Sequence, residues 1–171
     1  SEPSEIRCLG FCVSVKHAEF MASFFNDQGC RALSLSSSSS EEERNSAKNR
    51  IRNGDINFIF TVDLYNEGVD IPEIDTVMFL RPTESLTVFL QQLGRGLRTS
   101  RNKEFLTVLD YIGQSNKKYS FENKFKTLLN KKNRGLINEI KNGSMSLPSG
   151  CHIEMEKEAM EIILDNIKGF H

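Results

Sequence analysis

Short runs of apolar residues alternate with amphipathic segments along the first two thirds of the chain. Apolar runs of four to eight residues bounded by turn residues are typical of buried strands, and they occupy residues 6–13, 31–35, 56–60, 75–80 and 105–109. The segments between them carry apolar residues at the spacing of a helix face. Strands that alternate with helices predict an α/β fold, in which right-handed crossovers join a parallel sheet of about five to six strands flanked by helices.

The first predicted helix is bounded by residues that favour helix ends. It follows Ser14 and stops at Gly29, because serine is a favoured N-cap and glycine a favoured terminator. We expect this helix to carry its aromatic residues, Phe20, Phe24 and Phe25, into the core.

Five consecutive serines, residues 36–40, precede the second predicted helix. Low-complexity serine is typical of a mobile loop. The last serine, Ser40, forms a capping-box pattern with Glu43, and this pattern opens a helix that runs through about Arg52.

The stretch from Ser85 to Arg98 is predicted to be a helix with two different faces. Leucines recur on one stripe, at positions 86, 90, 93 and 97. Gln91, Arg95 and Arg98 cluster well over a quarter-turn from that stripe, at about 100° per residue. The helix holds no acid to pair with the arginines, and planar guanidinium groups suit phosphate oxygens. We therefore expect this face to bind an anion.

A second polar segment, Thr61 to Asp70, directly follows the apolar strand at residues 56–60. It therefore lies at a strand's carboxyl end, where open α/β sheets place their ligands. Gly68 allows close approach of the backbone to a ligand, and Asp70 can accept a hydrogen bond from a hydroxyl such as that of a ribose. Pro72 ends any helical turn that lies between.

Together these two segments resemble paired motifs of superfamily two helicases. Thr61 to Pro72, TVDLYNEGVDIP, resembles motif V, and Gln91 to Arg98, QQLGRGLR, resembles motif VI with its pattern Q-x-x-G-R-x-x-R. The resemblance covers roughly the first 115 residues, as the second RecA-like lobe of such a motor. The sequences EGVDIPE and LQQLGRGLR are similar to the restriction-enzyme-like branch (type III restriction or DEAH-like), and less so to the DEAD-box RNA helicases.

The resemblance implies a role for each motif residue near the nucleotide. Arg95 and Arg98 would act as arginine fingers on the γ-phosphate, and Gln91 would help at the interface between lobes. Gly68 and Asp70 would approach the nucleotide or couple it to that interface. These roles match the cations that phosphoryl transfer requires.

The resemblance also implies contacts with a nucleic-acid backbone. The turn at Ser14 resembles motif IV, in which a small hydroxyl touches the backbone, and Thr61 would make a similar contact. A plain N-cap is an equally good interpretation of Ser14. Related lobes tend to carry a threonine-containing turn near residues 36–40, and the serine run departs from that pattern.

Other parts of the nucleotide machinery are missing from this sequence. It contains no G-x-x-x-x-G-K-[ST] and no Asp-Glu pair after a strand. We therefore expect ATP and Mg²⁺ to be used by a larger parent protein, in which an N-terminal RecA-like lobe holds the Mg²⁺. The parent would be an ATP-dependent helicase or ATPase acting on a DNA strand, with RNA as the alternative, and this chain alone would be inactive.

The composition changes after Gly113, so we place the lobe at residues 1–114 and a helical extension at 115–171. Residues 115–141 hold eight Lys or Arg against two Glu. Lys117, Lys118 and Lys124 are candidates for contact with a phosphate backbone, although a solvated charged face is the commoner reason for such a run. Apolar residues beginning at Phe121 would dock this helix on the lobe. An acidic amphipathic helix is expected at residues 154–168.

Overall charge and composition limit the other possibilities. The net charge of −1 argues against a domain-wide electrostatic grip on nucleic acid. The chain begins at Ser1 without Met, which is typical of an excised piece, and no apolar run approaches a membrane span. We expect a cytoplasmic protein with no membrane contact.

The four cysteines, at positions 8, 12, 30 and 151, allow two interpretations. They could form a metal site with His17 or His152, or they could be reduced cysteines in a core. Because there is no C-x-x-C pair, we favour the core and expect no metal.

Two other functions fit parts of the pattern. An ATP-independent nucleic-acid-binding or docking module would use the basic surface, but it would have no use for the unpaired arginines. A small-molecule enzyme on a doubly wound sheet would need a nucleophile or base, and none of the three histidines has a convincing setting.

Overall fold

The computed structural model describes residues 6–62, 71–81, 106–111, 121, 136–142, 152 and 154–169. These residues fall into two compact units. The first holds the described residues up to Arg81 together with residues 106–111, and the second holds the described residues from Phe121 onward.

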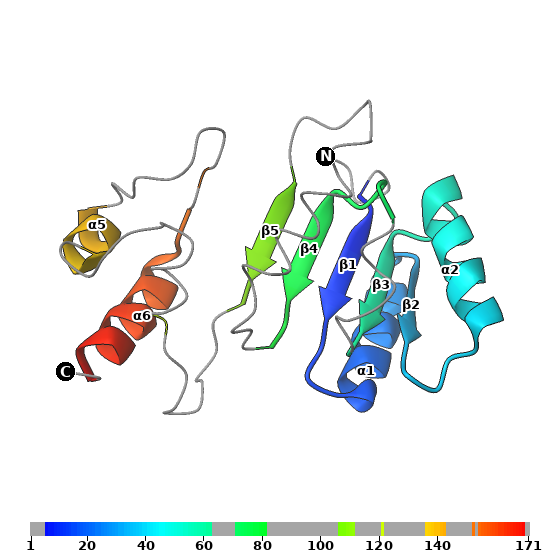
Figure 1. Ribbon diagram of the computed structural model, residues 1–171, viewed down its shortest axis with the longest axis horizontal. Helices are drawn as coiled ribbons and strands as arrows, with labels where there is room; N and C mark the ends of the chain where they lie inside the picture. The colour runs from blue at the N-terminus through cyan, green and yellow to red at the C-terminus, as the bar shows by residue number, and fades with distance from the viewer. Residues whose placement is uncertain are drawn as a thin grey trace. The chain divides into compact units, whose positions relative to one another are not determined.

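Five parallel strands form the sheet of the first unit, as the apolar runs predicted. They are β1 (Cys8–Phe11), β2 (Ala32–Leu35), β3 (Phe58–Thr61), β4 (Thr76–Phe79) and β5 (Thr107–Asp110). Their order is β2-β3-β1-β4-β5, so the first strand of the chain lies in the middle of the sheet (Figure 1). The predicted α/β fold is confirmed.

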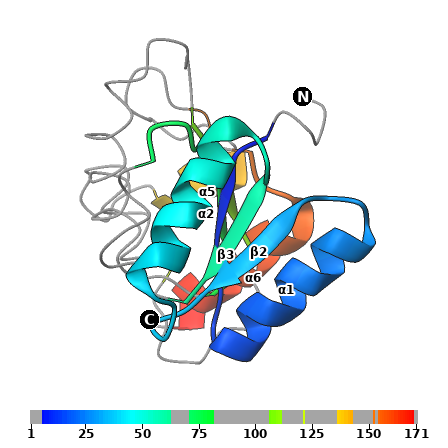
Figure 2. The same cartoon turned by 90° about the vertical axis from the view of Figure 1, so that its right-hand side faces the viewer.

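Two helices cover opposite faces of this sheet (Figure 2). Helix α1 (Val15–Asp27) joins β1 to β2, and α2 (Glu41–Asn53) joins β2 to β3. The chain moves outward in the first connection and back inward in the second. Because both crossovers are right-handed, the two helices must lie on different faces.

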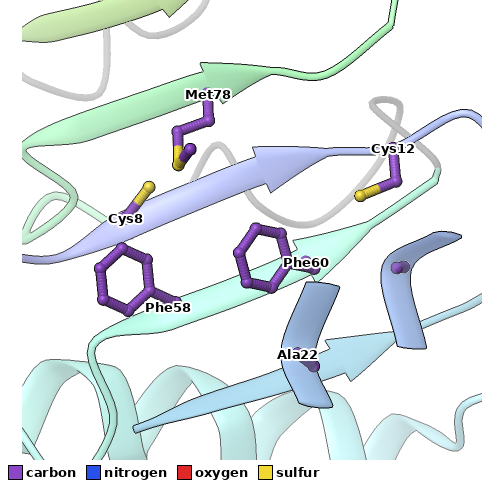
Figure 3. Close-up of a cluster of buried hydrophobic side chains, with 7 residues drawn as sticks. Cys8, Cys12, Ala22, Phe58, Phe60 and Met78 are labelled. Atoms are coloured by element: carbon purple, nitrogen blue, oxygen red, sulfur yellow. The ribbon is translucent and has the colours of Figure 1, made fainter. Parts of the chain in front are cut away.

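The core beneath α1 is built from small helix residues and large strand residues (Figure 3). Its buried members are Cys8, Cys12, Ala18, Ala22, Phe58, Phe60 and Met78. Ala18 and Ala22 let the helix approach closely, and Phe25 fills the gap with its ring centroid 5.0 Å from that of Phe60. Gly10 makes room for the ring of Phe60, since a Cβ at position 10 would lie 2.6 Å from Cε1 of that ring.

The prediction that all three aromatic residues of α1 point inward was wrong for two of them. Phe20 and Phe24 are 63% and 49% exposed. Their rings stack on each other with centroids 6.2 Å apart. The buried face is set by Ala18 and Ala22, and at about 100° per residue Phe20 lies nearly half a turn away from it.

The amino edge of the sheet is joined by polar side chains. Asn57, which is 2% exposed, donates through Nδ2 to the Ile6 carbonyl at 3.0 Å and accepts from Nε of Arg31 at 3.0 Å. The Asp75 carboxylate accepts from the Arg7 backbone N–H at 3.0 and 3.1 Å. A buried amide is stable only with such partners, and these bonds fix the starts of β1, β2, β3 and β4.

The second unit contains α5 (Leu136–Asn142) and α6 (Lys157–Gly169). Its core consists of Phe121, Ile140, Ile163, Leu164 and Ile167. The predicted acidic helix is therefore present. Phe121 packs in this core, and its backbone N–H donates to Oδ1 of Asn166 at 3.2 Å; that it docks on the lobe stays a prediction.

Candidate functional site

The carboxyl ends of the five strands form one continuous edge, which we call the carboxyl edge. The register aligns their last residues in a row, and in sheet order these are Leu35, Thr61, Phe11, Phe79 and Asp110. Backbone bonds continue beyond the strands, since Cys12 donates to the Thr61 carbonyl at 2.8 Å. Open parallel sheets bind their ligands at such an edge.

Two of the predicted nucleic-acid contacts lie at this edge on adjacent strands. Thr61 closes β3 and is half-buried, and Ser14 follows β1 by three residues and is exposed. The bond from Cys12 to Thr61 fixes how far the two strands extend side by side. The fold therefore places two hydroxyl residues that are far apart in the sequence at the same edge of the sheet.

Ser14 is the N-cap of α1, so the capping interpretation is confirmed. Its backbone is extended, with φ −151° and ψ 164°, and its Oγ accepts from the His17 backbone N–H at 3.2 Å. Accepting this bond uses a lone pair of the hydroxyl oxygen and leaves the hydroxyl hydrogen to donate elsewhere. Capping and donation to a phosphate oxygen are therefore chemically compatible.

The serine run at residues 36–40, where we expected a mobile loop, forms a hydrogen-bonded turn. Ser36 donates from its backbone N–H to Oγ of Ser39 at 3.0 Å, and Ser39 donates back to the Ser36 carbonyl at 3.1 Å. Arg44 of α2 donates to the carbonyls of Ser36 and Ser37, both at 3.2 Å. These bonds close the turn through a residue that low-complexity reasoning does not consider.

The capping box of α2 is present as predicted. Oγ of Ser40 accepts from the Glu43 backbone N–H at 3.1 Å, and the Glu43 carboxylate accepts from the Ser40 backbone N–H at 2.7 Å. The helix ends at Gly54, whose φ is +82°. That left-handed conformation favours glycine.

Arg81 is a cation at the carboxyl edge that the sequence reasoning did not single out. It follows β4 directly after Leu80, and it is half-buried. The Arg81 guanidinium acts on the pKa of Cys12. Burial raises the pKa of that thiol to about 11, and the positive charge of Arg81 partly opposes the rise. The sequence could have pointed to Arg81, because it is a charged residue directly after a predicted buried strand.

Most of the other predicted site residues lie outside the described residues. Gly68 and Asp70 belong to this group, as do Gln91, Arg95 and Arg98 of the predicted arginine helix. Lys117, Lys118 and Lys124 of the extension also belong to it. Their roles stay predictions.

The cysteines of the first unit behave as core residues. Cys8 and Cys12 are buried side chains of the α1 core, and Cys30 is half-buried. Burial raises the pKa of Cys8 well above its ordinary range, and the negative charge of Asp75 raises it further. A protonated thiol is a poor metal ligand. No group of three His, Cys, Asp or Glu placed to hold a metal occurs within residues 6–62, 71–81 and the other described segments.

None of the helices within the described residues combines the length and the apolar character that crossing a bilayer needs.

Solved structures share this architecture of a parallel sheet with helices on both faces. The DEAD-box protein SrmB of E. coli, crystallised with the regulator RraA, has a TM-score of 0.53 and 23% identity, over 64% of this chain and 63% of that chain. The Hef helicase domain of Pyrococcus furiosus has a TM-score of 0.51 and 21% identity, over 65% and 23%. These likenesses define the first unit as a RecA-like α/β lobe.

The particular family follows from the sequence. The helicase conserved C-terminal domain family matches residues 2–100, so this chain belongs to that family. The putative ATP-dependent helicase IRC3 of Saccharomyces cerevisiae is 31% identical over 107 residues. That alignment covers 63% of this chain but only 16% of the yeast protein. The chain therefore spans a small part of the length of this relative.

Proposed function

We propose that this chain is the second lobe of an ATP-dependent helicase or translocase that acts on DNA, in the restriction-enzyme-like branch. The observation that carries the proposal is the position of Ser14 and Thr61 at the same carboxyl edge, within a family match that also includes Thr61–Pro72 and Gln91–Arg98. A hydroxyl pair at a sheet's ligand edge suits a phosphate backbone, because each hydroxyl can donate to a phosphate oxygen.

In this proposal the arginine helix serves the nucleotide. Arg95 and Arg98 face the γ-phosphate of ATP across the gap between lobes and stabilise the charge that develops in transfer. Gln91 contacts the opposite lobe, and Gly68 and Asp70 approach the nucleotide. ATP with Mg²⁺ supplies the phosphoryl group and the bridging cation, and the acids that hold Mg²⁺ belong to the N-terminal lobe of the parent.

The nucleic-acid strand is held by contacts that do not read its sequence. Ser14 and Thr61 donate to backbone phosphates at the carboxyl edge. Lys117, Lys118 and Lys124 add electrostatic attraction from the extension, which is about six charges positive over residues 115–141. Closing and reopening of the two lobes on ATP would then move the lobe along the strand.

The first prediction concerns Arg95 in the full-length parent. Arg95→Ala should lower DNA-stimulated ATP hydrolysis by at least about a thousandfold, because an arginine finger contributes that much to phosphoryl transfer. The matched control is Arg52→Ala, which removes an exposed arginine paired with Glu73 at 3.1 Å and should leave turnover unchanged. Retained ATPase activity in Arg95→Ala would refute the assignment.

A second candidate function is an ATP-independent binding module, which the basic residues 115–141 favour. It predicts a parent that binds DNA without hydrolysing ATP. The helicase proposal instead predicts that the parent hydrolyses ATP when DNA is added and that this chain alone does not hydrolyse ATP. Single-stranded RNA added in place of DNA would test the choice of polymer.

A further inference from the structure

The turn that carries Ser14 is held by a reciprocal pair of hydrogen bonds to His17. The Val13 backbone N–H donates to Nδ1 of His17 at 3.3 Å. The His17 backbone N–H donates to Oγ of Ser14 at 3.2 Å. The Ala18 N–H then donates to the Ser14 carbonyl at 3.0 Å as the first bond of the helix. The His17 ring therefore holds the Val13 backbone N–H directly before Ser14, while the His17 backbone N–H holds the Ser14 hydroxyl oxygen.

This arrangement resembles a capping box, except that the His17 ring accepts from the N–H of Val13, one residue before the N-cap, and not from the N-cap itself. The third helical residue of a capping box is ordinarily Glu or Gln, and in α2 the equivalent position is Glu43. In α1 an imidazole nitrogen takes the place of the carboxylate. An accepting Nδ1 requires the neutral tautomer with its hydrogen on Nε2. His17 thus supplies the acceptor without a negative charge.

The first turns of α1 and α2 also differ in their acidic residues. The first turn of α2 carries Glu41, Glu42 and Glu43, whereas the first turn of α1 carries no acidic residue. Negative residues at a helix N-terminus are stabilising by themselves, so stability alone does not explain their absence from α1. A nearby phosphate backbone does explain it, because a carboxylate beside Ser14 would repel phosphate.

We propose that His17 is the positioning residue for the nucleic-acid contact of Ser14. Its neutral ring holds the Val13–Ser14 backbone and leaves the Ser14 hydroxyl hydrogen to donate to a backbone phosphate, while no negative charge lies at that turn. The inference rests on the proposed function, since it assigns how one of the proposed contacts is built.

The test uses three substitutions in the full-length parent and measures ATPase rate against concentration of single-stranded DNA. His17→Ala removes the acceptor of the Val13 N–H and should raise the half-stimulating DNA concentration about fivefold, the effect of one lost hydrogen bond, with little change in maximal rate. His17→Gln retains a neutral acceptor and should restore most of the affinity. His17→Glu retains the acceptor but adds a negative charge, and it should weaken DNA stimulation at least as much as Ala does.

Thermal unfolding of the same proteins separates positioning from stability. His17→Glu should unfold at the same temperature as the original protein or higher, although its half-stimulating DNA concentration rises. The matched control is Asn26→Ala, which removes two 2.9 Å bonds between the other end of α1 and the backbone of Ala32. It should lower the unfolding temperature without changing the half-stimulating concentration.

The outcomes distinguish the role of His17 from the proposed function of the lobe. If Gln and Ala at position 17 weaken DNA stimulation equally, or if Ala changes nothing while the parent remains a DNA-stimulated ATPase, the inference about His17 is wrong and the proposed function stands. If the parent shows no DNA-stimulated hydrolysis, both fail together.

Discussion

Cys12 couples the stability of the fold to alkaline pH. Its pKa is raised to about 11, chiefly because the thiol is buried. The ordinary value, which applies in the unfolded chain, is 9.0. A raised pKa contributes stability that is fully present below about pH 9 and is lost as the pH rises through about 11. We therefore expect the free energy of unfolding to fall over this range, as measured by urea denaturation at several pH values.

Cys12→Ala is the control for this prediction. The substitution removes one thiol that ionises on unfolding, so the fall between pH 9 and pH 11 should become shallower, while Cys8 keeps its own contribution. Equal slopes in the two proteins would mean that Cys12 is not protected by burial.

Single residues show what the sequence could and could not reveal. The N-cap at Ser14 and the buried thiols were predictable, because both follow from local sequence. The exposure of Phe20 and Phe24 was not, because several residues of α1 are apolar and the pattern leaves the inward face ambiguous. The close packing of Ala18 and Ala22 on the sheet selects the inward face of α1. This packing joins residues that are distant in the sequence.

Helix α1 gives a prediction in which two adjacent aromatic residues behave differently. Phe25→Ala should lower the free energy of unfolding by about 2 to 4 kcal/mol, because its ring packs 4.7 Å from the ring of Phe58, centroid to centroid. Phe24→Ala should change it by about 1 kcal/mol or less, since that side chain is 49% exposed and lies outside the buried core. Chemical denaturation of both variants measures the difference. Similar losses in the two would show that α1 is rotated from its assigned face.

Helix α2 depends on one serine of its run and hardly on the others. Ser40→Ala removes the cap that accepts from the Glu43 N–H at 3.1 Å, and it should destabilise the lobe by about 1 kcal/mol. Ser37→Ala is the matched control, because it makes the same change at an exposed side chain of the same run and should have little effect. The two unfolding midpoints would coincide only if the cap did not contribute.

The elements were predictable to the extent that they follow from short-range pattern. The apolar runs located all five strands, and Ser40 with Glu43 located the start of α2. The ordered serine turn was missed because its stability comes from Arg44, which binds the carbonyls of Ser36 and Ser37. A residue on the next helix cannot be inferred from the composition of the loop.

The distribution of charge over the whole molecule leads to a prediction about salt. The chain has a net charge of −1, yet residues 115–141 are about six charges positive. Replacing Lys117, Lys118 and Lys124 together by Ala in the parent should weaken DNA binding at every sequence and reduce the slope of log affinity against log salt by about two to three. Fluorescence anisotropy across a salt series measures both quantities.

The matched control for the lysines is the triple substitution to Arg. It retains the positive charges and should retain the slope. An unchanged slope in the Ala variant would mean that the basic residues 115–141 form a solvated surface and do not bind DNA.

The parallel sheet of the whole molecule was predictable from the alternation of strands and helices, but the strand order was not fixed by the pattern. Several orders satisfy the same pattern and the same handedness, and packing selects β2-β3-β1-β4-β5. Within the site, Thr61 was predicted to lie at a strand's carboxyl end, and the parallel pairing of β1 with β3 adds Ser14 to the same edge. The proposed roles of Arg95 and Arg98 would require an opposing lobe, whose position no single-chain pattern encodes.

The central position of β1 has a consequence for synthesis of the protein. This strand leaves the ribosome before its partners, yet it pairs on one side with β3 and on the other with β4, whose first residues lie 50 and 68 positions later (Cys8 with Phe58 and Thr76). Until both emerge, an apolar strand has two open edges. Such delayed pairing slows folding and exposes the nascent chain to aggregation, so we expect the growing lobe to be a client of chaperones until about residue 80 is outside the exit tunnel.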